Sequence, residues 1–204
     1  MIYFIGAGPG DEDLITVKGR RIIEAADLVV FTGSLVSKTH LKYCKPDCVK
    51  ISSAPLTLEE VMDKLIEFHD QNLTVVRLHT GDPSIYGAIG EQIKILDERK
   101  IDFEVVPGVS SFTAACSSLK KEFTLPGISQ TVIVTRLAGR TPVPEKEDLE
   151  LLARHQCSMA IFLSVKDMKT VVKKLTAGYG SDQIPIAVVY KATWPDEKII
   201  KGTL

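Results

Sequence analysis

Seven short apolar runs, most of them rich in β-branched residues, alternate along this 204-residue chain with stretches of helical periodicity. The runs span residues 2–5, 27–31, 73–78, 102–106, 130–135, 159–163 and 185–190. Apolar residues recur at helical spacing over 57–70 and 167–177. Continuous apolar strands separated by amphipathic helices are typical of parallel sheets that helices cover on both faces. We therefore predict an α/β fold.

The chain changes character near Pro107-Gly108, where a predicted strand passes into a helix of small residues over 110–118 and then into a turn at Pro126-Gly127. We place a domain boundary there, so that an N-terminal α/β domain spans 1–112 and a C-terminal α/β domain spans 113–204. Each half is too small to enclose a large ligand by itself. A cofactor is therefore expected in the cleft between the two domains.

The charges of the chain nearly cancel, because 25 Lys and Arg stand against 26 Asp and Glu. We therefore expect no nucleic acid and no membrane as a partner. The N-terminal segment lacks the basic start of a signal peptide, and no window approaches the roughly 18 apolar residues of a membrane span, which indicates a cytoplasmic protein. The four cysteines and four histidines form no CxxC or HExxH spacing, so we expect no metal site.

A glycine loop, Gly6–Gly10, follows the first predicted strand and precedes a helix, which is the position of a dinucleotide phosphate loop. Pro9 removes one N–H from such a cradle, and the acidic residues 11–13 place negative charge where phosphate would bind. The second strand also ends without a carboxylate for ribose hydroxyls. A dinucleotide site is therefore disfavoured. A tight βα turn with acidic residues at a helix N-terminus and a role in binding another ligand both stay open.

A second loop, residues 79–83, comes at the carboxyl end of the apolar strand 73–78, where open α/β sheets bind their ligands. Asp82 is expected to face that crevice; the alternative is that it caps a helix beginning at Pro83. The next strand brings Ser110 and Ser111 to the same edge. One carboxylate, two hydroxyls and close backbone approach suit a cofactor that carries an ammonium group and a ribose.

Two signatures connect these loops to a known family. They are IGAGPGDEDLITVKG at 5–19, and VVRLHTGDPSIYG at 75–87 leading to FEVVPG at 103–108. Together and in this order they resemble the tetrapyrrole methyltransferases, the family of uroporphyrinogen-III and precorrin methyltransferases. Residues 129–145 and 188–199 resemble the branch that methylates precorrin-4 or its cobalt form at C-11. A sibling precorrin or uroporphyrinogen-III methyltransferase, a diphthine synthase and a non-catalytic nucleotide-binding domain stay open as alternatives.

The resemblance implies two α/β domains of the tetrapyrrole methylase type, with S-adenosyl-L-methionine in the cleft between them and S-adenosyl-L-homocysteine as its product. It also implies a homodimer, a glycine loop that faces the tetrapyrrole more than the cofactor, and family members that continue beyond Leu204, so that the second domain is expected to be incomplete. The positions that match the family's cofactor contacts are Pro9, Asp82, Ile85, Ser110, Ser111, Leu163 and Ala192. For Ile85 and Leu163, core packing is the alternative.

A tetrapyrrole carries many acetate and propionate groups, so its site needs local cations and hydroxyls. Arg136 and Arg140 are the best candidates because guanidinium pairs bidentately with carboxylate, and Lys191, Arg77 and Ser34 are lesser candidates. A solvated surface charge is the alternative for each arginine. No catalytic acid or base is assigned, although His79 stands beside the second loop.

Overall fold

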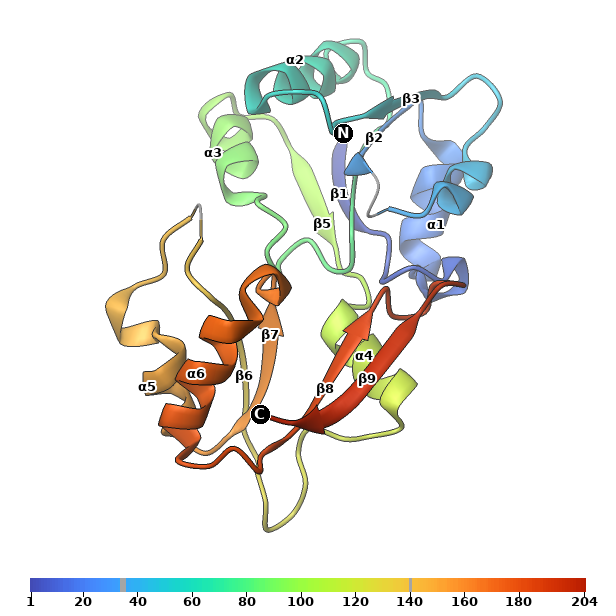
Figure 1. Ribbon diagram of the computed structural model, residues 1–204. Coiled ribbons are helices and arrows are strands. Elements are labelled where there is room, and N and C mark those ends of the chain that lie inside the picture. Colours follow the sequence, from blue (N-terminus) through green and yellow to red (C-terminus); the bar gives the residue numbers. More distant parts are fainter. Residues whose placement is uncertain (34–35, 140) are drawn as a thin grey trace. The chain divides into compact units, whose positions relative to one another are not determined.

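The computed structural model describes residues 1–33, 36–139 and 141–204 (Figure 1). The chain divides into two compact units, the first formed by Met1–Ala115 with Lys191–Glu197 and the second by Cys116–Tyr190 with Lys198–Leu204. Strands and helices alternate in both, which confirms the predicted α/β class. Residues 191–197 pack with the first unit, an association that no sequence pattern indicated.

The first unit is built on a five-stranded parallel sheet with the strand order β3-β2-β4-β1-β5. Its strands are β1 (Ile2–Gly6), β2 (Leu28–Phe31), β3 (Val49–Ser52), β4 (Val75–His79) and β5 (Phe103–Val106). The central strands β1, β2 and β4 are buried almost throughout, which explains why they read as continuous apolar runs.

Helices cover both faces of this sheet. On one face, α1 (Val17–Ala25) and the 3-10 helix η3 (Lys38–Tyr43) pack on alternate residues such as Ile5 and Val29. On the other face, α2 (Leu58–His69) and α3 (Gly90–Glu98) pack on Phe4 and Val30. Successive side chains of each strand point to opposite faces of the sheet, so one apolar run contributes to two hydrophobic cores.

Strand β3 was not expected from the sequence. It lies at the edge of the sheet, and its residues are exposed or half-buried, with Val49 41% exposed. A four-residue edge strand that carries Lys50 needs no continuous apolar run, because only one side of it pairs and little of it is covered. Its backbone pairing with β2, rather than its hydrophobicity, defines it.

The second unit contains two small sheets. The strands β6 (Val132–Arg136) and β7 (Ser158–Phe162) pair in parallel, and β8 (Pro185–Tyr190) and β9 (Lys198–Thr203) pair antiparallel. A short helix η4 (Glu145–Glu147) leads into α5 (Leu149–Ala153), and η5 (Val165–Asp167) leads into α6 (Met168–Tyr179). Helices α5 and α6 form one core through Leu149, Val171 and Leu175.

Helix α4 (Ser111–Leu119) begins in the first unit and ends in the second. Over the described parts of the chain, no helix has the length and apolar character needed to cross a bilayer. Over those same parts, no group of three or more His, Cys, Asp or Glu residues is arranged to hold a metal ion.

Candidate functional site

Three glycines bring three strand ends of the first unit into direct contact. Gly6 ends β1, and Gly81 and Gly108 follow β4 and β5. A Cβ placed on Gly6 would lie 2.5 Å from the carbonyl oxygen of Gly81 and 2.7 Å from the Cα of Gly108, and one on Gly108 would lie 2.2 Å from that same oxygen. Side chains are excluded here because the backbones themselves touch. The loops 79–83 and 107–111 therefore converge, as the sequence predicted.

The carboxylate of Asp82 joins two of these loops. One oxygen accepts hydrogen bonds from the hydroxyl and from the N–H of Ser84, the latter at 2.8 Å, and the other accepts from the N–H of Gly108 at 2.9 Å. Partial burial opposes ionisation of Asp82, but these hydrogen bonds outweigh it and hold the pKa of the carboxyl below its usual value. Asp82 is thus a negative charge at neutral pH, half-buried among backbone groups.

The expected alternative, that Asp82 caps a helix beginning at Pro83, is wrong. Residues 83–86 form a turn, and the next helix begins only at Gly90. Tyr86 and Ala88 both have positive φ, 55° and 51°, which cannot continue a right-handed helix. The Asp82 side chain therefore organises a loop, and Ile85 is half-buried in the turn rather than packed in the core.

The glycine loop 6–10 lies against the second loop. The N–H of Ala7 donates to the carbonyl of His79 at 2.8 Å, and Gly8 and Gly81 exchange two hydrogen bonds at 3.2 and 2.8 Å. These N–H groups are not available to cradle a pyrophosphate, which agrees with the objections raised from the sequence. Asp11 accepts a hydrogen bond from Asp13 N–H and caps the short helix η1 (Glu12–Leu14), so the acidic residues do stand at a helix N-terminus.

The segment Lys191–Glu197, which we call the strap, packs on the far end of the glycine loop. The indole N–H of Trp194 donates to the carbonyl of Pro9 at 2.7 Å, and the hydroxyl of Thr193 accepts from Asp11 N–H at 2.9 Å. Ala192 is 6% exposed in this segment. Sequence reasoning missed Trp194 and Thr193, although Trp194 is the single tryptophan of the chain.

Two buried basic side chains stand side by side on β4. Arg77 bonds to Val30 O at 3.2 Å and to the Gln92 side chain at 3.4 Å, which makes it a structural residue rather than a substrate clamp. His79 is 2% exposed, and its Nε2 has no hydrogen-bond partner in the described structure. Burial, followed by the Arg77 charge, lowers the pKa of His79 to about 3. His79 is therefore neutral at physiological pH and unsuited to donate a proton there.

Leu163 in the second unit is 74% exposed and has a φ of 55°, a left-handed conformation that is uncommon for leucine. The buried hydroxyl of Ser164 fixes this bend, since it donates to Phe162 O at 2.6 Å and accepts from Leu137 N–H at 2.8 Å. Core packing, the alternative considered for Leu163, is therefore wrong. Strained and exposed residues of this kind cluster at ligand sites.

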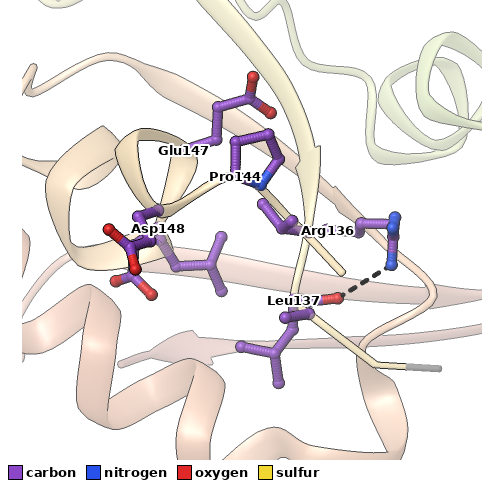
Figure 2. A pocket seen from close by; sticks show the side chains of 9 residues that line it. Arg136, Leu137, Pro144, Glu147 and Asp148 are labelled. Carbon is purple, nitrogen blue, oxygen red and sulfur yellow. Dashed lines mark hydrogen bonds between the residues drawn. The ribbon is translucent and has the colours of Figure 1, made fainter. Parts of the chain in front are cut away.

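Arg136 turns toward its own loop. Its guanidinium donates to the carbonyls of Thr141 and Pro142, both at 3.0 Å, and to that of Leu137 at 3.4 Å, the last drawn in Figure 2. The adjacent cavity of about 160 Å³ is lined by Arg136 and in part by carboxylates, so its surface carries charges of both signs. These carboxylates belong to Glu145, Glu147 and Asp148.

The other residues predicted to bind the substrate are Lys191, Ser34 and Arg140. Lys191 bonds to Asp196 at 2.6 Å and lies 5.2 Å from the ring centre of Trp194, so it belongs to the strap. Ser34 and Arg140 lie outside the described residues. Pro9, Asp82, Ser110, Ser111 and Ala192 all belong to the first unit, whereas Leu163 and Arg136 belong to the second.

Comparison with known proteins identifies relatives of the whole chain. Residues 1–204 match the family of tetrapyrrole (corrin/porphyrin) methylases. The chain is 54% identical over 203 residues to a cobalt-precorrin-4 C(11)-methyltransferase of Methanocaldococcus jannaschii, covering all of this chain and 78% of that protein. It is 48% identical to a precorrin-4 C(11)-methyltransferase of Pseudomonas aeruginosa, covering all of this chain and 80% of the relative.

Solved structures agree with these sequence matches. A cobalt precorrin-4 methyltransferase superposes with a TM-score of 0.96 at 48% identity, over 99% of this chain and 84% of the other. A uroporphyrin-III C-methyltransferase of Thermus thermophilus, complexed with S-adenyl homocysteine, gives a TM-score of 0.81 at 26% identity, over 99% of this chain and 82% of the other. Both solved structures share the fold of this chain, although their names give different substrates. The sequence identity is higher to the cobalt precorrin-4 methyltransferase than to the uroporphyrin-III C-methyltransferase.

Proposed function

This chain belongs to the tetrapyrrole methylase family, and on that premise we propose that it transfers a methyl group from S-adenosyl-L-methionine to C-11 of precorrin-4 or cobalt-precorrin-4. The observation that carries this function is the 54% and 48% identity, over the full chain, to two C(11)-methyltransferases. The reaction belongs to cobalamin biosynthesis. Identity to a uroporphyrinogen-III C-methyltransferase of Bacillus subtilis is lower, at 33%.

The residues around Asp82 suit the cofactor that this function requires. S-adenosyl-L-methionine carries a sulfonium charge, an ammonium group and ribose hydroxyls, all of which an ionised carboxylate attracts or accepts. Asp82 supplies that carboxylate, and the bare backbone of Gly81 and Gly108 lets a ligand approach closely. We assign Asp82, Ile85, Ser110, Ser111 and Ala192 of the first unit to the cofactor. Pro9 is a further member of this set.

We also propose Leu163, a residue of the second unit, as a cofactor contact. Its exposed side chain offers an apolar surface to an adenine ring, and the Ser164 hydrogen bonds hold the backbone bend that presents it. A contact that is already ordered loses less conformational entropy on binding. The left-handed backbone at this leucine is then strain that serves ligand binding.

Methyl transfer from this cofactor needs little acid or base catalysis by the protein. The cofactor supplies an electrophilic methyl group on sulfur, and the reduced tetrapyrrole supplies a nucleophilic ring carbon. The residues of the chain have to hold the two in line, which by itself accelerates such a transfer strongly. His79, being neutral and buried, takes no part as a proton donor at physiological pH.

For the tetrapyrrole we propose the glycine loop 6–10 together with Lys191 of the strap. Lys191 has its ammonium group beside the Trp194 ring, close to that loop, and would have to exchange Asp196 for a carboxylate of the macrocycle. Arg136, with Arg140 and Ser34 beyond the described residues, stays a proposal for the same role. Because Arg136 donates to its own loop, it would have to exchange those carbonyls for a substrate carboxylate.

We also propose that the protein forms a homodimer and works in the cytoplasm. Light scattering coupled to gel filtration measures the first, with twice the 22.4 kDa chain mass expected. A monomer at micromolar concentration would contradict the dimer. Fractionation of source cells measures the second, and recovery of the protein with membranes would contradict it.

The function is tested by incubating the protein with methyl-labelled cofactor and enzymatically prepared precorrin-4 or cobalt-precorrin-4, and by locating the label through NMR of the product. We expect label at C-11. Label at another carbon assigns the chain to a sibling methyltransferase, and label on uroporphyrinogen-III assigns it to that branch. Running both forms of precorrin-4 decides whether the substrate contains cobalt.

A further inference from the structure

The strap contacts the glycine loop through the indole ring of Trp194. The carbonyl of Pro9 accepts the indole N–H of Trp194, and Gly10 lies directly against the same ring. A Cβ on Gly10 would fall 2.1 Å from Cδ1 and 2.3 Å from Nε1 of Trp194. The indole therefore occupies the space that any side chain at position 10 would need.

The neighbouring residue of the strap adds a second tie. Thr193 accepts a hydrogen bond from Asp11 N–H at 2.9 Å, and its own N–H donates to the Glu197 carboxylate at 2.7 Å. Thr193 has a φ of 70°, a left-handed conformation that a β-branched residue rarely adopts. The backbone strain is local to the residue whose hydroxyl meets the loop.

These two ties hold the part of the glycine loop that the sheet does not hold. Ala7 bonds to His79 at the end of β4 and Gly8 to Gly81 just after it, and Asp82 is fixed by Ser84 and Gly108 without help from the strap. Among the described residues, by contrast, the hydrogen bonds that connect residues 9–11 to another segment come from the strap.

We infer that Trp194 is a positioning residue for methyl transfer, fixing residues 9–11 of the glycine loop in the shape that receives the tetrapyrrole. This inference rests on the proposed function, which gives that loop to the tetrapyrrole. Trp194 bonds to Pro9, which is one of the proposed cofactor contacts, but the strap does not hold the Asp82 carboxylate. Loss of the Trp194 hydrogen bond is therefore expected to raise the Michaelis constant for the tetrapyrrole more than it weakens cofactor binding.

The test compares Trp194→Phe, which keeps an aromatic ring but removes the N–H donor, with the wild-type protein. We expect the KM for the tetrapyrrole to rise roughly three- to ten-fold, the range produced by loss of one neutral hydrogen bond. The kcat at saturating tetrapyrrole should stay within about two-fold of wild type, and the dissociation constant of S-adenosyl-L-homocysteine by calorimetry should rise by a smaller factor than the KM. An unchanged KM, or an equal loss of cofactor affinity, would overturn the inference.

Two variants of Thr193 test the second hydrogen bond between the strap and the glycine loop. Thr193→Val removes the acceptor for Asp11 N–H and should raise the same KM, whereas Thr193→Ser keeps the oxygen and should not. Thr203→Val, on the exposed strand β9, is the matched control for a change of threonine to valine and should leave the KM unchanged. Equal behaviour of Thr193→Ser and Thr193→Val would contradict the role of the hydroxyl.

Gly10→Ala tests the contact even if a variant of Trp194 folds poorly. Trp194 is the only tryptophan, so its fluorescence reports the strap directly. Gly10→Ala should displace the indole, shift its emission to longer wavelength and raise the KM, but it should raise the KM no further in a Trp194→Ala background. Equal effects in both backgrounds, or an unchanged emission spectrum, would show that the indole does not hold this loop.

Failure of the proposed function would look different. If the wild-type protein transfers no methyl group to either form of precorrin-4, the assignment of the reaction fails. The inference about Trp194 is then decided by tetrapyrrole binding, followed through the absorbance of the macrocycle. Weaker binding by Trp194→Phe supports it, and equal binding by both proteins refutes it.

Discussion

Asp82 offers the sharpest test of the proposed cofactor site, because its carboxylate has a structural and a ligand role that two substitutions separate. Asp82→Ala removes the hydrogen bonds from Ser84 and Gly108 together with the charge. Asp82→Asn keeps the shape but can accept at only one of the two positions, since its amide nitrogen is a donor that faces either Ser84 or Gly108 N–H.

The expected magnitudes follow from these contacts. Hydrogen bonds to a charged group contribute about 1.5–3 kcal/mol each, and water recovers part of that at a half-buried site. We therefore expect Asp82→Ala to lower the free energy of unfolding by about 2–3 kcal/mol and Asp82→Asn by about 1–2 kcal/mol. Because the pKa of Asp82 lies below its usual value, this stabilisation is present above the ordinary carboxyl pKa and is lost only as the pH falls through the lowered one.

Urea unfolding at neutral pH measures the free energy of unfolding. Calorimetry measures the affinity for S-adenosyl-L-homocysteine. Both variants should bind that ligand at least about ten-fold more weakly than wild type, a loss of about 1.4 kcal/mol. Asp97→Asn, an exposed carboxylate on α3, is the control and should change neither. If Asp82→Asn is folded and binds S-adenosyl-L-homocysteine as tightly as wild type, the carboxylate is structural only and the cofactor assignment is refuted.

Three further outcomes are expected. Gly108→Ala places a Cβ 2.2 Å from the Gly81 carbonyl oxygen and should lower the free energy of unfolding by roughly 1–3 kcal/mol or more, whereas Gly139→Ala, which meets open space, should not; equal denaturation curves would contradict the contact. His79 has a pKa of about 3 against the usual 6.5, so the folded protein excludes a proton that the unfolded chain binds, and this residue lowers stability as the pH falls below 6.5. Its ring signals in NMR should accordingly show no titration between about pH 5 and 8, and a midpoint near 6.5 would disprove the burial argument. Leu163→Gly should relieve the left-handed backbone, leave the melting temperature equal or higher and weaken S-adenosyl-L-homocysteine binding; a lower melting temperature with unchanged binding would point to a packing role instead.

Much of the first unit follows from the chain alone. Buried parallel strands need continuous apolar runs, so β1, β2 and β4 are legible from their residues. Helix α2 is legible as well, because its apolar spacing agrees with a capping box between Thr57 and Glu60. The edge strand β3 is not, since an exposed strand is defined by its hydrogen bonds to a neighbour.

The candidate site divides in the same way. Parallel strands place their carboxyl ends at one edge, so a glycine or carboxylate that follows a strand is located by order alone, which is why Asp82 and Ser110 could be named from the sequence. Ile85 and Leu163 lie in apolar segments, which by themselves suggest core packing. Only the tertiary structure shows that Ile85 lies half-buried in a turn and that Leu163 is exposed with a left-handed backbone.

The partnership of Trp194 with Pro9 could not be read from the chain, because 185 positions separate the two residues. No periodicity relates an indole to a carbonyl at that distance, and only folding brings them together. The sequence by itself determined the α/β class, the family and the edge of the sheet where we propose that the cofactor binds. Tertiary structure decided which of the residues there are free to meet a ligand, since a side chain such as Arg77 or His79 is committed only by what surrounds it.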